Sequence, residues 1–217
     1  MAAVVMEHVN KTLKRRQVLK DINLTLEEGL IHGFYGRNAS GKTMLFRAVA
    51  GLIVPDSGSV TVLGKTITKD KSFPESMGLI IENIGLWNHL TGMENLSLLA
   101  DIRGVADKEA QRGAMKRVGL DPDDKRRYGA YSMGMKQKLA LAQAIMERPK
   151  ILILDEPTNG MDEESVLAFR ELMLEEKARG AACLIATHQK EDIRLLCDRV
   201  FLMRDGQCAE AEEGALG

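Results

Sequence analysis

Residues 36–43 read Gly-Arg-Asn-Ala-Ser-Gly-Lys-Thr, which matches the pattern G-x-x-x-x-G-K-[ST] of a phosphate-binding loop. A loop that opens a helix points several backbone N–H groups at one spot and adds the positive end of the helix dipole, so it binds phosphate well. Gly36 and Gly41 allow tight turns because they lack a Cβ. Lys42 brings a positive charge to the β- and γ-phosphates, and Thr43 offers a hydroxyl to Mg²⁺.

The segments on either side of the octet support this interpretation. Residues 30–35 form a short apolar run that predicts a strand, and residues 42–50 read as a helix. A strand before the loop and a helix after it form the context in which such a loop binds a nucleotide. We therefore expect the phosphates to contact one continuous segment, made of Gly36, Arg37, Asn38, Ala39, Ser40, Gly41, Lys42, Thr43 and Met44.

Composition narrows the class of protein. The chain has 217 residues, 45% of them hydrophobic and 28% charged, as expected for one globular domain. A net charge of −1 argues against a large basic surface for nucleic acid, so we expect no nucleic-acid partner and read the basic triplets at 14–16 and 125–127 as solvated loops. Three cysteines without metal-ligand spacing indicate reduced thiols in the cytosol, and we find neither a signal peptide nor an apolar run of membrane-spanning length.

The order of predicted elements gives the fold class. The first third is rich in strands, which we expect at residues 4–9 (as an edge strand), 18–26 and 59–63. A helical block follows, opened by a capping box at Thr91 and Glu94, with further helices at 107–118 and 132–147. Strands then alternate with helices, and a frayed tail ends the chain; we expect strands at 151–154, 181–186 and 199–203, helices at 162–179 and 190–197, and the tail at 209–217. This alternation predicts an α/β fold with a mostly parallel sheet and a site at the carboxyl ends of its strands.

Two acidic residues end the buried strand predicted at 151–154. We expect Asp155 to hold Mg²⁺ through water, together with Thr43, and Glu156 to act as the general base that polarises an attacking water. His188 ends another predicted strand. A histidine at such a place is usually structural, but here its imidazole would lie close enough to reach a γ-phosphate.

Five motifs in order and register make the chain resemble the ATP-binding subunits of ABC transporters along nearly its whole length. They are the loop at 36–43, Ser-Met-Gly-Met-Lys-Gln at 132–137, the run at 151–157, Asn-Gly-Met-Asp at 159–162, and His188. The resemblance implies a P-loop NTPase core with an antiparallel β subdomain (residues 1–85 and 150–217) and an α-helical subdomain (residues 86–149), within a single domain of 1–217. It also implies ATP and Mg²⁺ as cofactors.

The same resemblance implies a head-to-tail dimer that sandwiches two ATP molecules, here a homodimer because every element is present in one chain. Ser132 and the backbone of Gly134 would contact the γ-phosphate held by the other copy, at the N-terminus of their helix. Asp162 would lie at the interface between the two sites. ATP binding would close the dimer, and hydrolysis would reopen it.

The sequence departs from the family pattern at several positions. Glu82 stands where the family usually has a glutamine, and we expect this carboxylate near Mg²⁺ or the water. Leu13 occupies the place of an aromatic residue that often stacks on adenine, which puts base stacking in doubt. The signature reads Tyr-Ser-Met-Gly-Met at 131–135 and keeps the serine and second glycine of the usual Leu-Ser-Gly-Gly-Gln. Ala39 replaces a common glycine, which the loop accommodates if φ of Ala39 stays negative.

The leading hypothesis is a Mg-dependent ATPase that powers a separate membrane permease from the inner face of the cell membrane. The permease would bind the loop from Glu82 to Leu90 (residues 82–90), which contains Trp87. Residues 82–83 and 131–137 look most like the branch that exports peptide antibiotics or drugs. Two alternatives remain open: a soluble ABC ATPase that serves a non-transport assembly, and a regulatory nucleotide-binding module that scarcely hydrolyses ATP.

Overall fold

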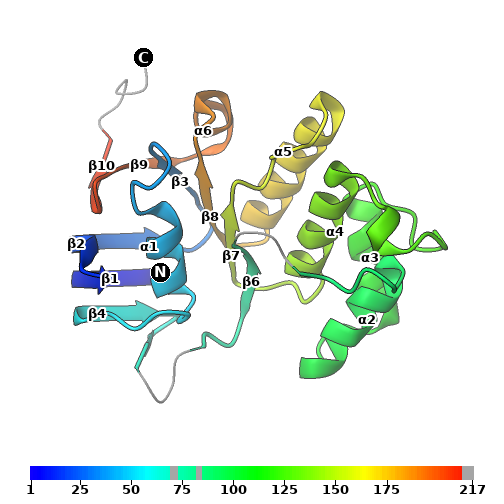
Figure 1. Ribbon diagram of the computed structural model, residues 1–217, viewed down its shortest axis with the longest axis horizontal. Coiled ribbons are helices and arrows are strands. Elements are labelled where there is room, and N and C mark those ends of the chain that lie inside the picture. Colours follow the sequence, from blue (N-terminus) through cyan, green and yellow to red (C-terminus); the bar gives the residue numbers. More distant parts are fainter. Residues whose placement is uncertain (69–72, 82–84, 212–217) are drawn as a thin grey trace.

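The computed structural model describes residues 1–68, 73–81 and 85–211, and it shows two sheets with helices packed around and beside them (Figure 1). The elements in chain order are β1 (Ala2–Leu13), β2 (Arg16–Glu27), β3 (Ile31–Tyr35), α1 (Lys42–Val49), β4 (Ser57–Val62), β5 (Lys65–Thr66), β6 (Met77–Ile80), α2 (Gly92–Arg103), α3 (Lys108–Arg117), α4 (Met133–Ile145), β7 (Ile151–Asp155), α5 (Glu163–Ala178), β8 (Ala182–Thr187), α6 (Lys190–Leu196), β9 (Arg199–Arg204) and β10 (Gln207–Glu210), with a 3₁₀ turn at Tyr128–Ala130.

The predicted α/β class and the mostly parallel sheet are confirmed. One sheet has the strand order β10-β9-β3-β8-β7-β6, in which only β10 runs antiparallel to its neighbour. The other sheet is antiparallel, with the order β2-β1-β4-β5. The predicted helices also lie at the expected places, within one or two residues at each end, and the capping box between Thr91 and Glu94 is present at the start of α2.

Two expectations about strands are wrong. The strand expected at the edge of a sheet, at residues 4–9, is part of β1 and lies between β2 and β4, because both of its edges find partners. The frayed tail expected from residue 209 is wrong for Ala209 and Glu210, which belong to β10. A tight turn at Asp205 and Gly206, both with positive φ, folds β10 back onto β9. Residues 212–217 lie outside the described residues.

Strand β7 lies between the two hydrophobic cores of the molecule and contributes side chains to both. Its first four residues are all fully buried. Because side chains of a strand alternate between its faces, Ile151 and Ile153 pack with the antiparallel sheet and α1, whereas Leu152 and Leu154 pack with the core residues of α4 and α5. A strand buried on both faces is continuously apolar, as the sequence predicted.

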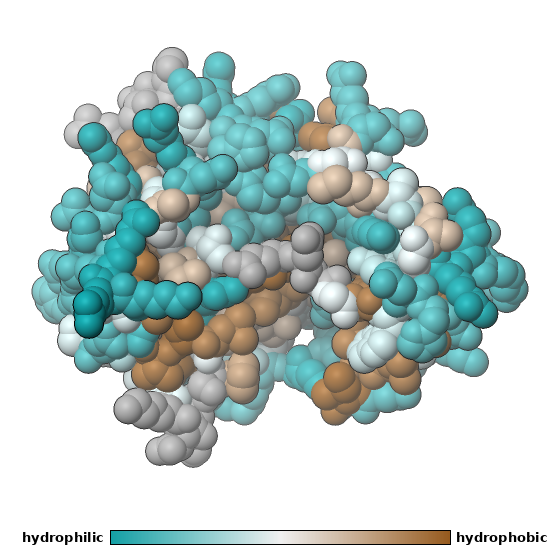
Figure 2. Space-filling model, in the orientation of Figure 1, coloured by the Kyte–Doolittle hydropathy of each residue, from teal (hydrophilic) through white to brown (hydrophobic). Residues whose placement is uncertain are grey.

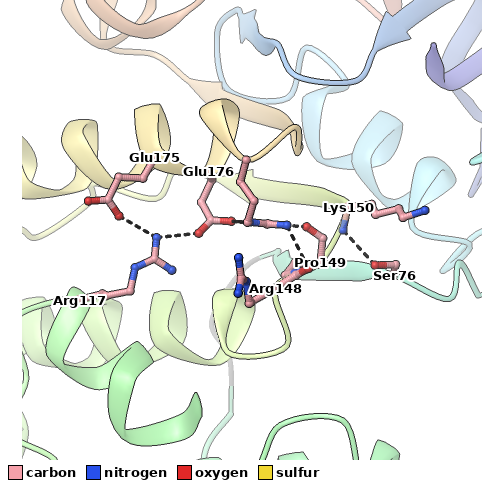
Figure 3. A network of polar contacts seen from close by, with 8 residues as sticks. Ser76, Arg117, Arg148, Pro149, Lys150, Glu175 and Glu176 are labelled. Atoms are coloured by element: carbon pink, nitrogen blue, oxygen red, sulfur yellow. Dashed lines mark hydrogen bonds and ion pairs between the residues drawn. The ribbon is translucent and has the colours of Figure 1, made fainter. Parts of the chain in front are cut away.

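A polar network ties the helices to the amino ends of β6 and β7 (Figure 3). Glu176 of α5 is 1% exposed and accepts hydrogen bonds from Arg117 of α3 (2.7 Å) and from Arg179 (Nε at 3.1 Å). Arg179 also donates to the carbonyl oxygen of Pro149 at 2.7 Å, and the N–H of Lys150 donates to Ser76 at 2.9 Å. These contacts hold α3, α5 and both strands together at the end opposite to the carboxyl ends of the strands.

Gly78 of β6 allows α4 to approach the sheet closely. A Cβ at this position would lie 2.0 Å from the carbonyl oxygen of Ala144, a backbone atom that cannot move away cheaply. We expect Gly78→Ala to lower the free energy of unfolding by about 2–3 kcal/mol, measured by urea denaturation. Gly113→Ala is the matched control, because Gly113 lies in α3 with open space around it; it should stabilise by about 0.5–1 kcal/mol. Equal stability changes in both variants would contradict the close-packing explanation.

Candidate functional site

A cavity of about 670 Å³ lies between the octet and the carboxyl end of β7. This is the edge of the parallel sheet at which α/β proteins bind ligands, and the sequence predicted the site there. The residues that line the cavity are Arg16, Gln17, Val18, Arg37, Asn38, Ala39, Ser40, Gly41, Lys42, Thr43, Met44, Met133, Gln137, Asp155, Glu156, Asn159, Asp205 and Gly206.

The octet forms a tight loop between β3 and α1. Gly36 has no room for a side chain, because a Cβ would lie 2.4 Å from the carbonyl oxygen of Met203. Gly41 occupies the N-cap of α1 with φ of +115°, a conformation that glycine adopts readily. Lys42 is 6% exposed and curls back over the loop, where its Nζ donates to the carbonyl oxygens of Gly36 at 2.6 Å and of Arg37 at 3.4 Å. The ammonium group is thus fixed next to the loop's backbone.

The condition under which the loop would accommodate Ala39 without strain, a negative φ, is not met. The N–H of Ser40 donates to the carbonyl oxygen of Arg37 at 3.2 Å and closes a turn whose third residue, Ala39, has φ of +63°. Turns of this kind favour glycine at that position. An alanine there costs about 1–2 kcal/mol of backbone strain, which the surrounding loop must offset.

The two predicted magnesium ligands from distant parts of the sequence meet in the cavity. Thr43 Oγ1 donates to Oδ2 of Asp155 at 2.5 Å, across 112 positions of the chain. Mg²⁺ is commonly bound by one or two protein oxygens together with substrate phosphates and water, so this hydroxyl–carboxylate pair fits a magnesium site beside the loop. Glu82, the third residue that we expected near the metal, lies outside the described residues.

Glu156 and His188 also meet, although 32 positions separate them. Nδ1 of His188 donates to Oε2 of Glu156 at 2.9 Å, and the Glu156 side chain is 21% exposed. The backbone of Glu156 is strained, with a positive φ of +49°. A hydrogen bond from its N–H to the carbonyl oxygen of Ala186, at 2.8 Å, stabilises this conformation. The imidazole that we expected near a γ-phosphate thus contacts the Glu156 carboxylate, and Glu156 itself lines the cavity.

The remaining predicted residues lie at two helix starts. Ser132 is the N-cap of α4 and accepts a hydrogen bond from the N–H of Met135 at 3.2 Å, and Gly134 follows in the first turn. Asp162 is the N-cap of α5, where hydrogen bonds from the side chain and the N–H of Ser165 lower the pKa of its carboxyl group. None of these three residues is among those that line the cavity within the described chain, whereas Met133 and Gln137 of α4 are.

Leu13 likewise does not line the cavity in the part of the chain that the structure describes. It ends β1, where it pairs with Arg16 across the hairpin, and the cavity is bounded instead by Arg16, Gln17 and Val18 at the start of β2. Sequence reasoning missed these three residues because the register of the hairpin decides which strand faces the loop. Gln137 could have been predicted to line the cavity, because it belongs to the segment at 132–137 that resembles the family signature.

The fold and the site together define a P-loop nucleotide-binding protein. A family profile described as ABC transporter matches residues 19–159. The ABC transporter ATP-binding protein YybJ of Bacillus subtilis (strain 168) is 45% identical over 206 residues, which cover 95% of this chain and 94% of YybJ. This chain therefore belongs to the ABC transporter family and is an ABC transporter ATPase subunit that binds ATP.

More distant relatives and a solved structure agree with this family assignment. The bacitracin transport ATP-binding protein BcrA of Bacillus licheniformis is 37% identical over 191 residues, covering 87% of this chain and 62% of BcrA. A solved dimeric ATP-binding cassette in a post-hydrolysis state with ADP and Pi is 23% identical and superposes with a TM-score of 0.87, covering 96% of this chain and 98% of the cassette. That likeness shows the fold. Among the described residues, no helix combines the length and the apolar character needed to cross a membrane.

Proposed function

We propose that this ATPase subunit hydrolyses ATP with the residues around the cavity and thereby drives a separate membrane permease. The observation that carries the proposal is the pairing of Glu156 with His188 at the edge of the cavity that Lys42 and Thr43 also line. A regulatory module that only binds nucleotide would have no need of a carboxylate held in this way, so the pairing favours hydrolysis.

The proposed roles follow from the chemistry of the side chains. The N–H groups of residues 36–44 and the ammonium of Lys42 bind the phosphates, and Thr43 and Asp155 hold Mg²⁺. The metal, when bound, neutralises charge on the phosphate oxygens. Glu156 accepts a proton from the water whose oxygen attacks the γ-phosphorus, and His188 orients Glu156. The bond from the γ-phosphorus to the β–γ bridging oxygen breaks, and ADP leaves with its electron pair.

The second copy of the chain completes this site in our proposal. The N-termini of α4 and α5, with Ser132, Gly134 and Asp162, lie outside the cavity of their own protomer and are available to a partner. Met133 is 67% exposed, an unusual state for a large apolar side chain next to a nucleotide cavity, and a second protomer would cover it. We further propose that residues 86–149 act as the helical subdomain of this dimer, with residues 1–85 and 150–217 as its core.

We propose that the permease binds at the inner face of the cell membrane, over the loop at residues 82–90, of which 82–84 lie outside the described residues, and the neighbouring surface. Trp87 is 43% exposed there, and Leu98 and Ile102 of α2 are 45% and 76% exposed. Figure 2 shows one group of hydrophobic side chains at the lower right, over the region of α2 in Figure 1, and a larger group left of centre, away from α2. Because relatives include bacitracin transport proteins, we propose a peptide antibiotic or a similar drug as the exported cargo.

Co-isolation from gently solubilised membranes tests the permease partner. A tagged copy of the chain should retain a membrane protein of several spans at near-stoichiometric yield, and Trp87→Ala should reduce that yield about tenfold, as expected when an aromatic anchor is lost from an interface. Leu167→Ala is the matched control, since Leu167 is 52% exposed on α5. Recovery of a soluble partner alone from crosslinked cells would refute the transporter proposal and favour a non-transport assembly.

A further inference from the structure

A buried carboxylate joins the two loops that supply Glu156 and His188. Asp192 lies on α6, four positions after His188, and is 2% exposed. Thr158 lies two positions after Glu156, in the segment between β7 and α5, and is 3% exposed. Their side chains meet where Thr158 Oγ1 donates to Oδ2 of Asp192 at 3.1 Å. The pair thus connects the carboxyl ends of β7 and β8 beneath the proposed catalytic residues.

The other oxygen of Asp192 is held from a third element. Arg170 of α5 donates from Nε at 3.1 Å and from Nη2 at 2.7 Å to Oδ1, and its side chain is 15% exposed. Glu191 also lies near Arg170, with Oε1 at 3.7 Å from Nη1. Because the Glu191 side chain is 75% exposed, this ion pair contributes little to holding Arg170. We name the set of Thr158, Arg170 and Asp192 the Asp192 junction. Each carboxylate oxygen has its own donor, so the position of Asp192 is fixed relative to α5.

The energetics of burial argue for an ordering role. Removing two charges from water is costly, and well-packed apolar side chains in place of a buried ion pair are often as stable or more stable. A contribution to folding stability therefore does not explain why Arg170 and Asp192 form a buried ion pair here. Directional contacts that join three segments (the Thr158 segment, α5 and α6), in contrast, specify one relative arrangement of those segments. Here the arrangement includes the 2.9 Å contact between His188 and Glu156, which depends on how the loops after β7 and β8 approach each other.

We propose that the Asp192 junction positions Glu156 and His188 for hydrolysis. Arg170, Asp192 and Thr158 are positioning residues in this proposal, because none of them lines the cavity in the described chain. The inference rests on the proposed roles of Glu156 and His188. Small displacements of a catalytic group cost large factors in rate, so loosening one contact of the junction should lower kcat with little effect on ATP binding.

Thr158→Val removes the hydroxyl at nearly constant volume, and we expect kcat for ATP hydrolysis to fall about tenfold with KM unchanged within about twofold. Thr158→Ser restores the hydroxyl and should recover most of kcat. Asp192→Asn is a second route to the same loss of kcat, since it removes the charge that pairs with Arg170. The matched control is Ser97→Ala, which deletes a 2.8 Å hydrogen bond to Gln111 far from the cavity and should leave kcat unchanged.

A double variant separates positioning from general structural damage. In a His188→Ala background, Thr158→Val should lower kcat by less than about twofold, because residues that act through one contact are not additive. A further tenfold loss there, or a normal kcat in Thr158→Val with only a lower Tm, would overturn the inference. If Glu156→Gln itself leaves turnover intact, the proposed function fails; if Glu156→Gln abolishes turnover while Thr158→Val is harmless, only the junction proposal fails.

Discussion

Glu156→Gln is expected to lower kcat for ATP hydrolysis by about 10²–10⁴-fold, the usual contribution of a general base. The amide keeps the size of the side chain and can still accept a hydrogen bond from His188, but it cannot take a proton from water. Because binding relies on other residues of the cavity, the Kd for ATP should change by less than about threefold, which is below 1 kcal/mol. Phosphate release under saturating Mg-ATP and ATP titration of the same preparation measure the two quantities.

Glu171→Gln is the control for this change of charge, since Glu171 is exposed on α5 away from the cavity. It should hydrolyse ATP at the rate of the unaltered protein. If our dimer proposal holds, Glu156→Gln should also accumulate as an ATP-bound dimer, visible by light scattering, because the γ-phosphate that closes the dimer is no longer removed. Turnover of Glu156→Gln close to the unaltered rate would refute the general-base role and support the regulatory alternative.

Lys42→Ala should weaken ATP binding by about 2–3 kcal/mol, or about 30- to 150-fold in Kd. The ammonium of Lys42 is 6% exposed and already placed beside the loop by the carbonyl oxygens of Gly36 and Arg37. A charge-assisted contact from a group that is ordered before binding is among the stronger polar interactions, because little entropy is lost when the phosphate arrives. Equilibrium binding of ATP to the purified variant measures the loss.

Lys108→Ala removes an equally charged side chain at the exposed start of α3 and serves as the comparison. Its Kd for ATP should match that of the unaltered protein. Thermal unfolding without nucleotide should give similar Tm values for all three proteins, whereas added ATP should raise the Tm of Lys42→Ala much less than that of the other two. An equal ATP-induced rise in Tm would show that Lys42 is not a phosphate ligand.

The local parts of the site could be predicted from sequence because they depend on neighbouring residues. The octet needs only a turn of glycines between a strand and a helix, and β3 and α1 supply both. The capping box before α2 and the N-caps Asp107, Ser132 and Asp162 are likewise contacts within four residues. The buried strands β7 and β8 could also be predicted locally, because a strand that is buried on both faces appears in the sequence as a continuous apolar run.

Contacts between residues that are far apart in the sequence could not be predicted locally and were seen only in the folded structure. The hairpin between β1 and β2 places Arg16, and not Leu13, beside the loop, and this depends on strand register. The positive φ of Ala39 depends on a turn closed inside a crowded loop. The inner position of β1 depends on β4, which returns to pair with it after α1.

The sequence by itself determined the family, the α/β class and the identity of Lys42, Thr43, Asp155 and Glu156 as candidate site residues, because each belongs to a short motif whose chemistry is local. That Thr43 and Asp155 share one site was expected from their motifs, but only the tertiary structure decided that the two side chains touch directly. It also decided that His188 contacts Glu156, and that Asp192 joins the loops that carry His188 and Glu156. The physical reason is that parallel strands bring their carboxyl ends to one edge of the sheet whatever their separation in the chain, so strand order, and not sequence distance, sets which side chains touch.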